Sequence, residues 1–188
     1  EYKVPGYYQA ASITRKAGAG GLLIMAKNTI KLHSIQIKNV LPEVQTIEFE
    51  FNKHKFIAVY RSPTIPKGTP EKVYHKSLID FLEGRIKKFN AKNHPYVLMG
   101  DFNLGELAAC HFDPDIKMTD YDNDDPDRLP SVETMWADFF MGNNLEQWVF
   151  EPTFPRYGSI LDIVMTPNDQ VVQNLTVEKE LFNGKFDH

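Results

Sequence analysis

The tetrapeptide Gly100-Asp101-Phe102-Asn103 places a carboxylate and an amide together at the end of an apolar run. The run Val97-Leu98-Met99 predicts a buried strand, and side chains two apart on an extended segment point to the same side. Asp101 and Asn103 are therefore expected to converge on one spot. An acid and an amide can orient a water and touch a metal-bound phosphate, although the same pair could also simply cap a loop.

A second acid, Asp162, stands inside the apolar run 160–165, where an unpaired carboxylate is costly. Its partner could be structural, such as a backbone amide, or it could hold a histidine in one tautomer. The candidate histidine is in Asp187-His188, whose adjacent side chains would point opposite ways on an extended chain, so that one could reach a metal. The other histidines are interpreted as surface or loop residues: His33, His54, His75, His94 and His111.

Tyr60-Arg61-Ser62-Pro63 closes another predicted strand. Tyr60 could offer a phenol to a phosphate, and Arg61 a fork of donors, but both could equally pack at the rim. The acidic segment 113–128 lacks the glycine and glutamate that a calcium loop requires, so it is interpreted as a solvated loop.

The elements that must position these groups alternate along the chain. A helix is expected to start at Thr69-Pro70-Glu71, with Thr69 as its cap and a basic outer face that is either solvated or directed to DNA. Ile47, Phe49 and Phe51 alternate with acids, which predicts a half-buried strand that forms a hairpin with 56–60. The remaining predictions are a helix over 131–142 and strands over 22–27, 32–37, 96–99, 145–150, 160–165 and 171–177. This alternation indicates one α/β domain with mixed sheets.

Composition narrows the class of protein. The longest apolar stretch, Leu22 to Ala26, is far too short to cross a membrane, and Cys110 is the one cysteine among 188 residues. A single cysteine suits a reducing, intracellular compartment. The net charge of −4 argues mildly against a protein that binds nucleic acid through phosphate neutralisation alone, and less against a metal nuclease.

Taken in order, five motifs resemble the endonuclease/exonuclease/phosphatase superfamily: Gly21-Leu22-Leu23-Ile24, Tyr60-Arg61-Ser62-Pro63, Gly100-Asp101-Phe102-Asn103, Ser159-Ile160-Leu161-Asp162-Ile163-Val164 and Asp187-His188. Within that superfamily, the stretch from Phe139 to Thr166 resembles the endonuclease domain of non-LTR retrotransposons. The resemblance implies an α/β fold in which a two-sheet β-sandwich is flanked by helices in four layers. It covers residues 1–188 as a single domain, which is expected to lack edge elements at both ends.

The resemblance also implies roles for the site residues. Asp101 would activate the attacking water, which Asn103 would help to orient, while Asp162 would orient His188 on the scissile phosphate. Tyr60 would touch the phosphate, and Asp187 would lie at a metal site with Asp101. The metal would be Mg²⁺ or Mn²⁺, but the family's principal glutamate ligand is expected upstream of Glu1, and Phe186 replaces the serine usual before Asp-His.

The function that follows from this resemblance is a metal-dependent endonuclease that nicks target DNA for a non-LTR retrotransposon. Its expected partners are DNA and a reverse transcriptase domain of the same polyprotein, with no membrane, a monomeric state and a nuclear place of action. Two alternatives stay open. One is another phosphoesterase of the superfamily, such as an abasic-site repair nuclease or a lipid or inositol phosphatase. The other is an inactive, truncated fragment.

Overall fold

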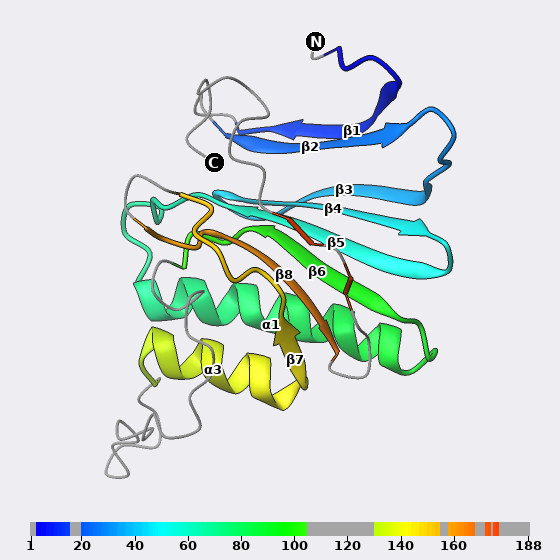
Figure 1. Ribbon diagram of the computed structural model, residues 1–188. Helices are drawn as coiled ribbons and strands as arrows, with labels where there is room; N and C mark the ends of the chain where they lie inside the picture. Colours follow the sequence, from blue (N-terminus) through cyan, green and yellow to red (C-terminus); the bar gives the residue numbers. More distant parts are fainter. Residues whose placement is uncertain are drawn as a thin grey trace.

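Two sheets and two helices make up the part of the chain that the computed structural model describes, which is residues 3–15, 20–104, 130–154, 158–167, 172–173 and 175–176. A two-stranded sheet lies on one side of a six-stranded sheet, and both helices lie on its other side (Figure 1). The elements are β1 (Tyr7–Thr14), β2 (Gly21–Lys27), β3 (His33–Leu41), β4 (Val44–Phe51), β5 (His54–Arg61), α1 (Glu71–Asn90), β6 (Tyr96–Asp101), α3 (Val132–Gly142), β7 (Leu145–Gln147) and β8 (Asp162–Pro167).

The six-stranded sheet has the order β3-β4-β5-β6-β8-β7 and is mostly antiparallel. The predicted hairpin is confirmed: β4 pairs with β5, and Phe51 opposes His54. Asn52 and Lys53 form the two-residue turn between them with φ angles of 52° and 67°, as a type I′ turn requires. The one parallel pair is β5–β6, and α1 makes the crossover between these strands.

Helix α1 differs from its prediction in two details, whereas α3 agrees with its prediction. The N-cap of α1 is Pro70, and no side chain caps it, so Thr69 does not have the predicted capping role. The outer face of α1 is not uniformly solvated, because Arg85 pairs with Glu48 on β4 and lies over the Phe89 ring at 5.4 Å. The helix predicted over 131–142 is confirmed as α3, and Ser131 caps it by accepting from the Thr134 amide at 3.1 Å.

Two apolar cores lie on the two faces of the large sheet. The larger core joins the sheet to both helices, and Trp136, Phe139 and Phe140 of α3 lie in it with at most 1% exposure. The smaller core joins the two sheets through Ala11, Ile47 and Ala58. Because both faces of β4 are covered, this strand is buried on both sides and not half-buried as predicted; Glu48 is 5% exposed and is paired with Lys38 and Arg85.

The fold class is therefore confirmed as an α/β sandwich of two sheets flanked by helices. The described residues supply three layers, and among them no helix covers the outer face of β1–β2. The strand predicted at 145–150 is shorter, since β7 ends at Gln147. The prediction for 171–177 lies largely outside the described residues, as does the acidic segment 113–128. No helix in the described part of the chain has the length and apolar character needed to cross a membrane.

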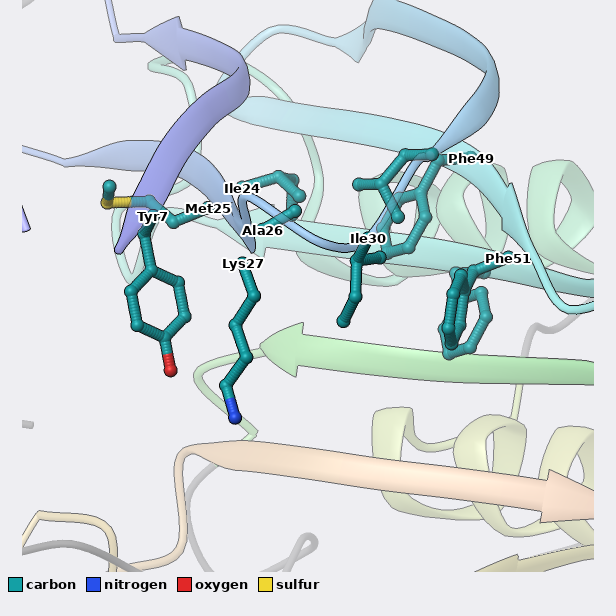
Figure 2. Close-up of a pocket in the computed structure, with 10 residues that line it drawn as sticks. Tyr7, Ile24, Met25, Ala26, Lys27, Ile30, Phe49 and Phe51 are labelled. Atoms are coloured by element: carbon teal, nitrogen blue, oxygen red, sulfur yellow. The ribbon is translucent and has the colours of Figure 1, made fainter. Parts of the chain in front are cut away.

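A hollow of about 330 Å³ opens between the sheets, at the end where the β4–β5 turn lies. Its walls are mostly apolar and include Ile24, Phe49 and Phe51, while Tyr7 and Lys27 extend side by side near its edge (Figure 2). No acid lines it. Phe56 in its wall is four residues along β5 from Tyr60, or about 13 Å. The hollow is thus separate from the residues that the sequence singles out for chemistry.

Candidate active site

A row of polar side chains crosses four strands of the large sheet at one register position. Gln45 opposes Tyr60, Tyr60 opposes Asp101, and Asp101 opposes Asp162. Residues opposite one another on neighbouring strands point to the same face of a sheet. Tyr60 and Asp101 lie two residues from Ala58 and Met99, which pack in the core between the two sheets, and residues two apart on a strand share a face. The polar row (Gln45, Tyr60, Asp101 and Asp162) therefore faces the β1–β2 sheet. The structure therefore brings together three of the predicted site residues.

Asp101 and Asp162 form the closest step of the row. The Phe102 amide donates to the Leu161 carbonyl at 2.9 Å, which makes that pair hydrogen-bonded and makes the next pair, Asp101–Asp162, a non-hydrogen-bonded one. In such pairs the Cα atoms are about 4.5 Å apart and the side chains are close. Asp162 is the first residue of β8 and half-buried, so it does not stand inside a buried run as predicted.

Thr153 fixes the start of β8. Its hydroxyl accepts hydrogen bonds from the Leu161 amide at 3.0 Å and from the Asp162 amide at 3.1 Å. Thr153 is 8% exposed, so this oxygen satisfies two backbone donors in a largely dry setting. The sequence gives no periodic or spacing signal for this role, because Thr153 lies in no described strand or helix.

Asn103 lies beside Asp101 for a different reason from the predicted one. The backbone is not extended there, since Asn103 has a φ of 48°. Instead, the Asn103 amide donates to Asp101 Oδ1 at 3.0 Å, and Asn103 Nδ2 donates to the Arg61 carbonyl at 2.7 Å. Gly100 permits the turn, because at its φ of 127° an added Cβ would lie 2.0 Å from the Val59 carbonyl oxygen.

Arg61 does not offer its fork of donors to the polar row. Its side chain is on the helix-facing side of β5, 5% exposed, and its Nε donates to the Phe102 carbonyl at 2.6 Å. Nη1 donates to the Ser62 carbonyl at 3.2 Å, and Nη2 donates to the Asn103 carbonyl. The alternative that Arg61 packs structurally is therefore correct, and the hypothesis of a phosphate ligand is wrong for this geometry.

The end of the β1–β2 hairpin lies over Tyr60. The Arg15 amide donates to the Gly20 carbonyl at 3.1 Å, and a Cβ on Gly20 would lie 2.1 Å from the Tyr60 hydroxyl. The Arg15 side chain pairs with Glu43. Burial and then the charge of Asp101 raise the pKa of the Tyr60 phenol, so it stays protonated at neutral pH and can donate a hydrogen bond. Neither Arg15 nor Gly20 was singled out from the sequence.

His75 is buried, which corrects its interpretation as a surface residue. It is on α1 with 3% exposure, and its Nδ1 accepts from Trp136 Nε1 at 2.9 Å. Burial, with a contribution from the nearby Arg61 charge, lowers its pKa from 6.5 to about 4. His75 is thus neutral at physiological pH. His33 and His54 are exposed, as predicted, and His94 lies in a loop.

The donor set of the polar row is chemically suited to a hard cation. Carboxylate oxygens of Asp101 and Asp162 are the ligand type that Mg²⁺ takes. Across the described ranges, however, no three His, Cys, Asp or Glu side chains form a group able to hold a metal ion. Asp187 and His188, which the sequence assigned to the metal and the phosphate, lie outside those ranges. The described residues by themselves therefore form no complete set of metal ligands.

Comparisons with solved structures match most of the chain. The 3′-5′ exonuclease NExo from Neisseria meningitidis has a TM-score of 0.53 and 18% identity, covering 87% of this chain and 68% of that one. The 3′ phosphatase NExo from Neisseria, bound to product DNA hairpin, has a TM-score of 0.52 and 15% identity, covering 87% and 68%. The chain has the endonuclease/exonuclease/phosphatase fold. The polar row lies at one end of this sandwich, where β5 and β6 end and β8 begins.

A third structural match is the endonuclease domain of TRAS1, a telomere-specific non-LTR retrotransposon. Its TM-score is 0.41 with 14% identity, covering 88% of this chain and 67% of that one, and a likeness this loose has no bearing on function. No family model matches the chain, and no curated protein matches it by sequence.

Proposed function

We propose that this chain is a divalent-metal-dependent phosphodiesterase that nicks DNA. The observation that carries the proposal is the polar row, in which Tyr60, Asp101 and Asp162 stand on adjacent strands at one end of an endonuclease/exonuclease/phosphatase fold. Both NExo structures belong to proteins named for removing nucleotides or phosphate at 3′ ends, and one holds DNA. DNA is therefore the substrate class that we assign to this chain.

The proposed reaction is in-line hydrolysis of a phosphodiester. The Asp101 carboxylate accepts a proton from a water, which Asn103 helps to orient, and the water oxygen forms a bond to phosphorus. The bond from phosphorus to the 3′ oxygen breaks, that oxygen takes a proton from solvent, and the products are a 3′ hydroxyl and a 5′ phosphate. Tyr60, kept protonated by its raised pKa, donates a hydrogen bond to a phosphate oxygen.

Two further groups complete the proposal. Mg²⁺ or Mn²⁺, held by Asp101 and Asp187, would supply Lewis-acid stabilisation of charge on the phosphate oxygens. Asp162 would orient His188 against the scissile phosphate. We further propose that the parent protein is a non-LTR retrotransposon polyprotein in which a reverse transcriptase domain uses the nick, and that it acts in the nucleus. The motif order in the sequence is the support for this finer assignment.

Covalently closed, supercoiled plasmid is the substrate that separates the alternatives. A 3′-5′ exonuclease has no end to attack on a closed circle, whereas an endonuclease relaxes it with a single cut. We expect nicking in Mg²⁺, loss of nicking in EDTA, and a loss of about 10²-fold or more in Asp101→Asn. Glu83→Gln, on the exposed face of α1, is the matched control and should nick like wild type.

Other outcomes of these assays would favour one of the alternative functions. Nicking only of plasmid that carries abasic sites would favour a repair nuclease over a retrotransposon endonuclease. Release of phosphate from inositol phosphates without any cut in DNA would favour a phosphatase. An intact plasmid with no phosphatase activity, and Asp101→Asn equal to wild type, would overturn the proposal and leave an inactive fragment.

A further inference from the structure

Arg61 is a buried cation whose hydrogen bonds converge on the backbone of the site. Two of its three acceptors, the carbonyls of Phe102 and Asn103, belong to the tetrapeptide that begins at Gly100. The third is its own neighbour, Ser62. The side chain lies under the sheet, on the face opposite the polar row, so it supports the site from behind.

The sheet holds this segment only through the Phe102 amide, which donates to the Leu161 carbonyl. The pairing of β5 with β6 ends at Tyr60–Asp101, and the pairing of β6 with β8 ends at Asp101–Asp162. Beyond Asp101, the Phe102 and Asn103 carbonyls therefore have no place in the strand ladder. A buried carbonyl without a partner costs free energy, and Arg61 supplies the donors that the ladder does not.

The contact is reciprocal and has a second anchor. Asn103 Nδ2 returns a hydrogen bond to the Arg61 carbonyl at 2.7 Å, which closes a ring between the ends of β5 and β6. Phe102 is fully buried, and Trp136 of α3 meets its ring edge-on with centroids 6.0 Å apart. The left-handed φ of 48° at Asn103 is a strained conformation that these contacts hold in place.

Burying a guanidinium costs free energy unless its N–H groups donate hydrogen bonds. Burial lowers the pKa of Arg61, and the nearby Tyr74, Asp101 and Glu71 side chains partly offset that effect. The planar fork reaches several carbonyls at once, whereas a lysine presents a single ammonium and cannot reproduce this geometry. Through these contacts Arg61 holds the backbone at Phe102 and Asn103 in place.

We propose that Arg61 is a positioning residue that sets the location of Asp101 and Asn103 for phosphodiester hydrolysis, and that it makes no contact with the substrate. The role rests on the proposed function. A displacement of about 1 Å in a catalytic group costs about 10²-fold in rate. Loss of the fork should therefore lower kcat while leaving substrate binding unchanged.

Arg61→Lys tests this role against Arg85→Lys as a matched control. Arg85, on α1, is also an arginine paired with a buried group, the Glu48 carboxylate. Its partners Glu48 and Phe89 both lie outside the tetrapeptide. In plasmid nicking with Mg²⁺ we expect Arg61→Lys to lose about 100-fold in kcat with KM within about twofold, and Arg85→Lys to keep both. A raised KM at unchanged kcat would instead make Arg61 a substrate ligand, and unchanged kcat and KM would also overturn the proposal.

Amide hydrogen exchange tests the clamp without any activity. In Arg61→Lys, the Phe102 and Asn103 amides should exchange at least about tenfold faster, while those in the middle of α1 stay as in wild type. If wild-type protein never cuts DNA, this measurement still decides the clamp, and it is the proposed function that fails. Should Arg61→Lys not fold, Arg61→Gln, which keeps a side-chain amide donor, takes its place: a larger rise in exchange at the Phe102 and Asn103 amides than at Leu98 supports the clamp, and exchange equal to wild type at both overturns it.

Discussion

Asp101 and Asp162 stand opposite each other on β6 and β8 as a non-hydrogen-bonded pair, which places two carboxylates side by side at the end of the sheet. Like charges directly opposite on neighbouring strands destabilise a sheet by about 0.2–1 kcal/mol. A divalent cation held by Asp101, next to Asp162, would offset this repulsion. The pairing therefore links stability to metal binding in a way that can be measured without substrate.

Asp162→Asn should stabilise the protein in EDTA and weaken its response to Mg²⁺. Removing one charge relieves the repulsion, so the free energy of unfolding should rise by about 0.2–1 kcal/mol. For wild type, Mg²⁺ at about ten times its Kd should add about 1.4 kcal/mol, or about 4 °C in Tm. Thermal unfolding with and without Mg²⁺ is the measurement.

The control for this metal response is Glu83→Gln, which removes an exposed acid on α1 far from the pair. It should keep the full Mg²⁺ shift. Equal Mg²⁺ shifts in wild type and in Asp162→Asn would show that the charge of Asp162 does not help to hold the ion.

Gly100→Ala should be strongly destabilising, whereas Gly84→Ala should not. An added Cβ at Gly100 would lie 2.0 Å from the Val59 carbonyl oxygen, at a φ of 127° that suits glycine alone. We expect a loss of about 3 kcal/mol or more. Gly84 lies in α1 with open space around its Cβ position, so alanine there should add about 1 kcal/mol. Urea unfolding of both variants checks this, and comparable stabilities would contradict the packing described around Gly100.

The sequence predicted those features that depend only on residue type and spacing within one short segment. Asp101 at the end of an apolar run, the hairpin of β4 with β5 and the helix over 131–142 each follow from local chemistry, and the structure has them in place. The polar row was only partly visible, because register across strands depends on long-range pairing that no local pattern encodes.

Long-range burial explains the errors. His75 and Arg61 resemble surface residues in the sequence, since histidine and arginine are usually exposed. Their burial follows from α1 packing under β5, which brings Arg61 beneath the tetrapeptide and Trp136 against His75. Thr153 gains its role only when β8 pairs with β6 and its hydroxyl faces two amides.

Thr153→Val should loosen the start of β8. Valine keeps the shape but removes the oxygen that accepts from the Leu161 and Asp162 amides, so two buried donors lose their partner. We expect a loss of about 2 kcal/mol in urea unfolding, together with lower nicking activity because Asp162 is less well fixed. Thr153→Ser retains the hydroxyl and should lose less than about 1 kcal/mol. If serine and valine are equally harmful, the methyl group and not the hydroxyl is what matters.

His75 should make the protein acid-sensitive. Its pKa in the folded state is about 4, below the ordinary value of 6.5, because it is buried with the Arg61 charge nearby; Glu133 has the opposite, smaller effect. Between these two values the unfolded state binds the extra proton, so stability is full above about pH 6.5 and falls as pH drops toward 4. The loss from His75 between pH 7 and 4.5 should be on the order of 2 kcal/mol. Urea unfolding of wild type and His75→Gln at both pH values isolates it, since glutamine can still accept from Trp136 but does not titrate. Carboxylates elsewhere titrate in both proteins, so their contribution cancels when the two pH dependences are subtracted.

An identical pH dependence in the two proteins would show that His75 is protonated as readily in the folded state as in the unfolded one.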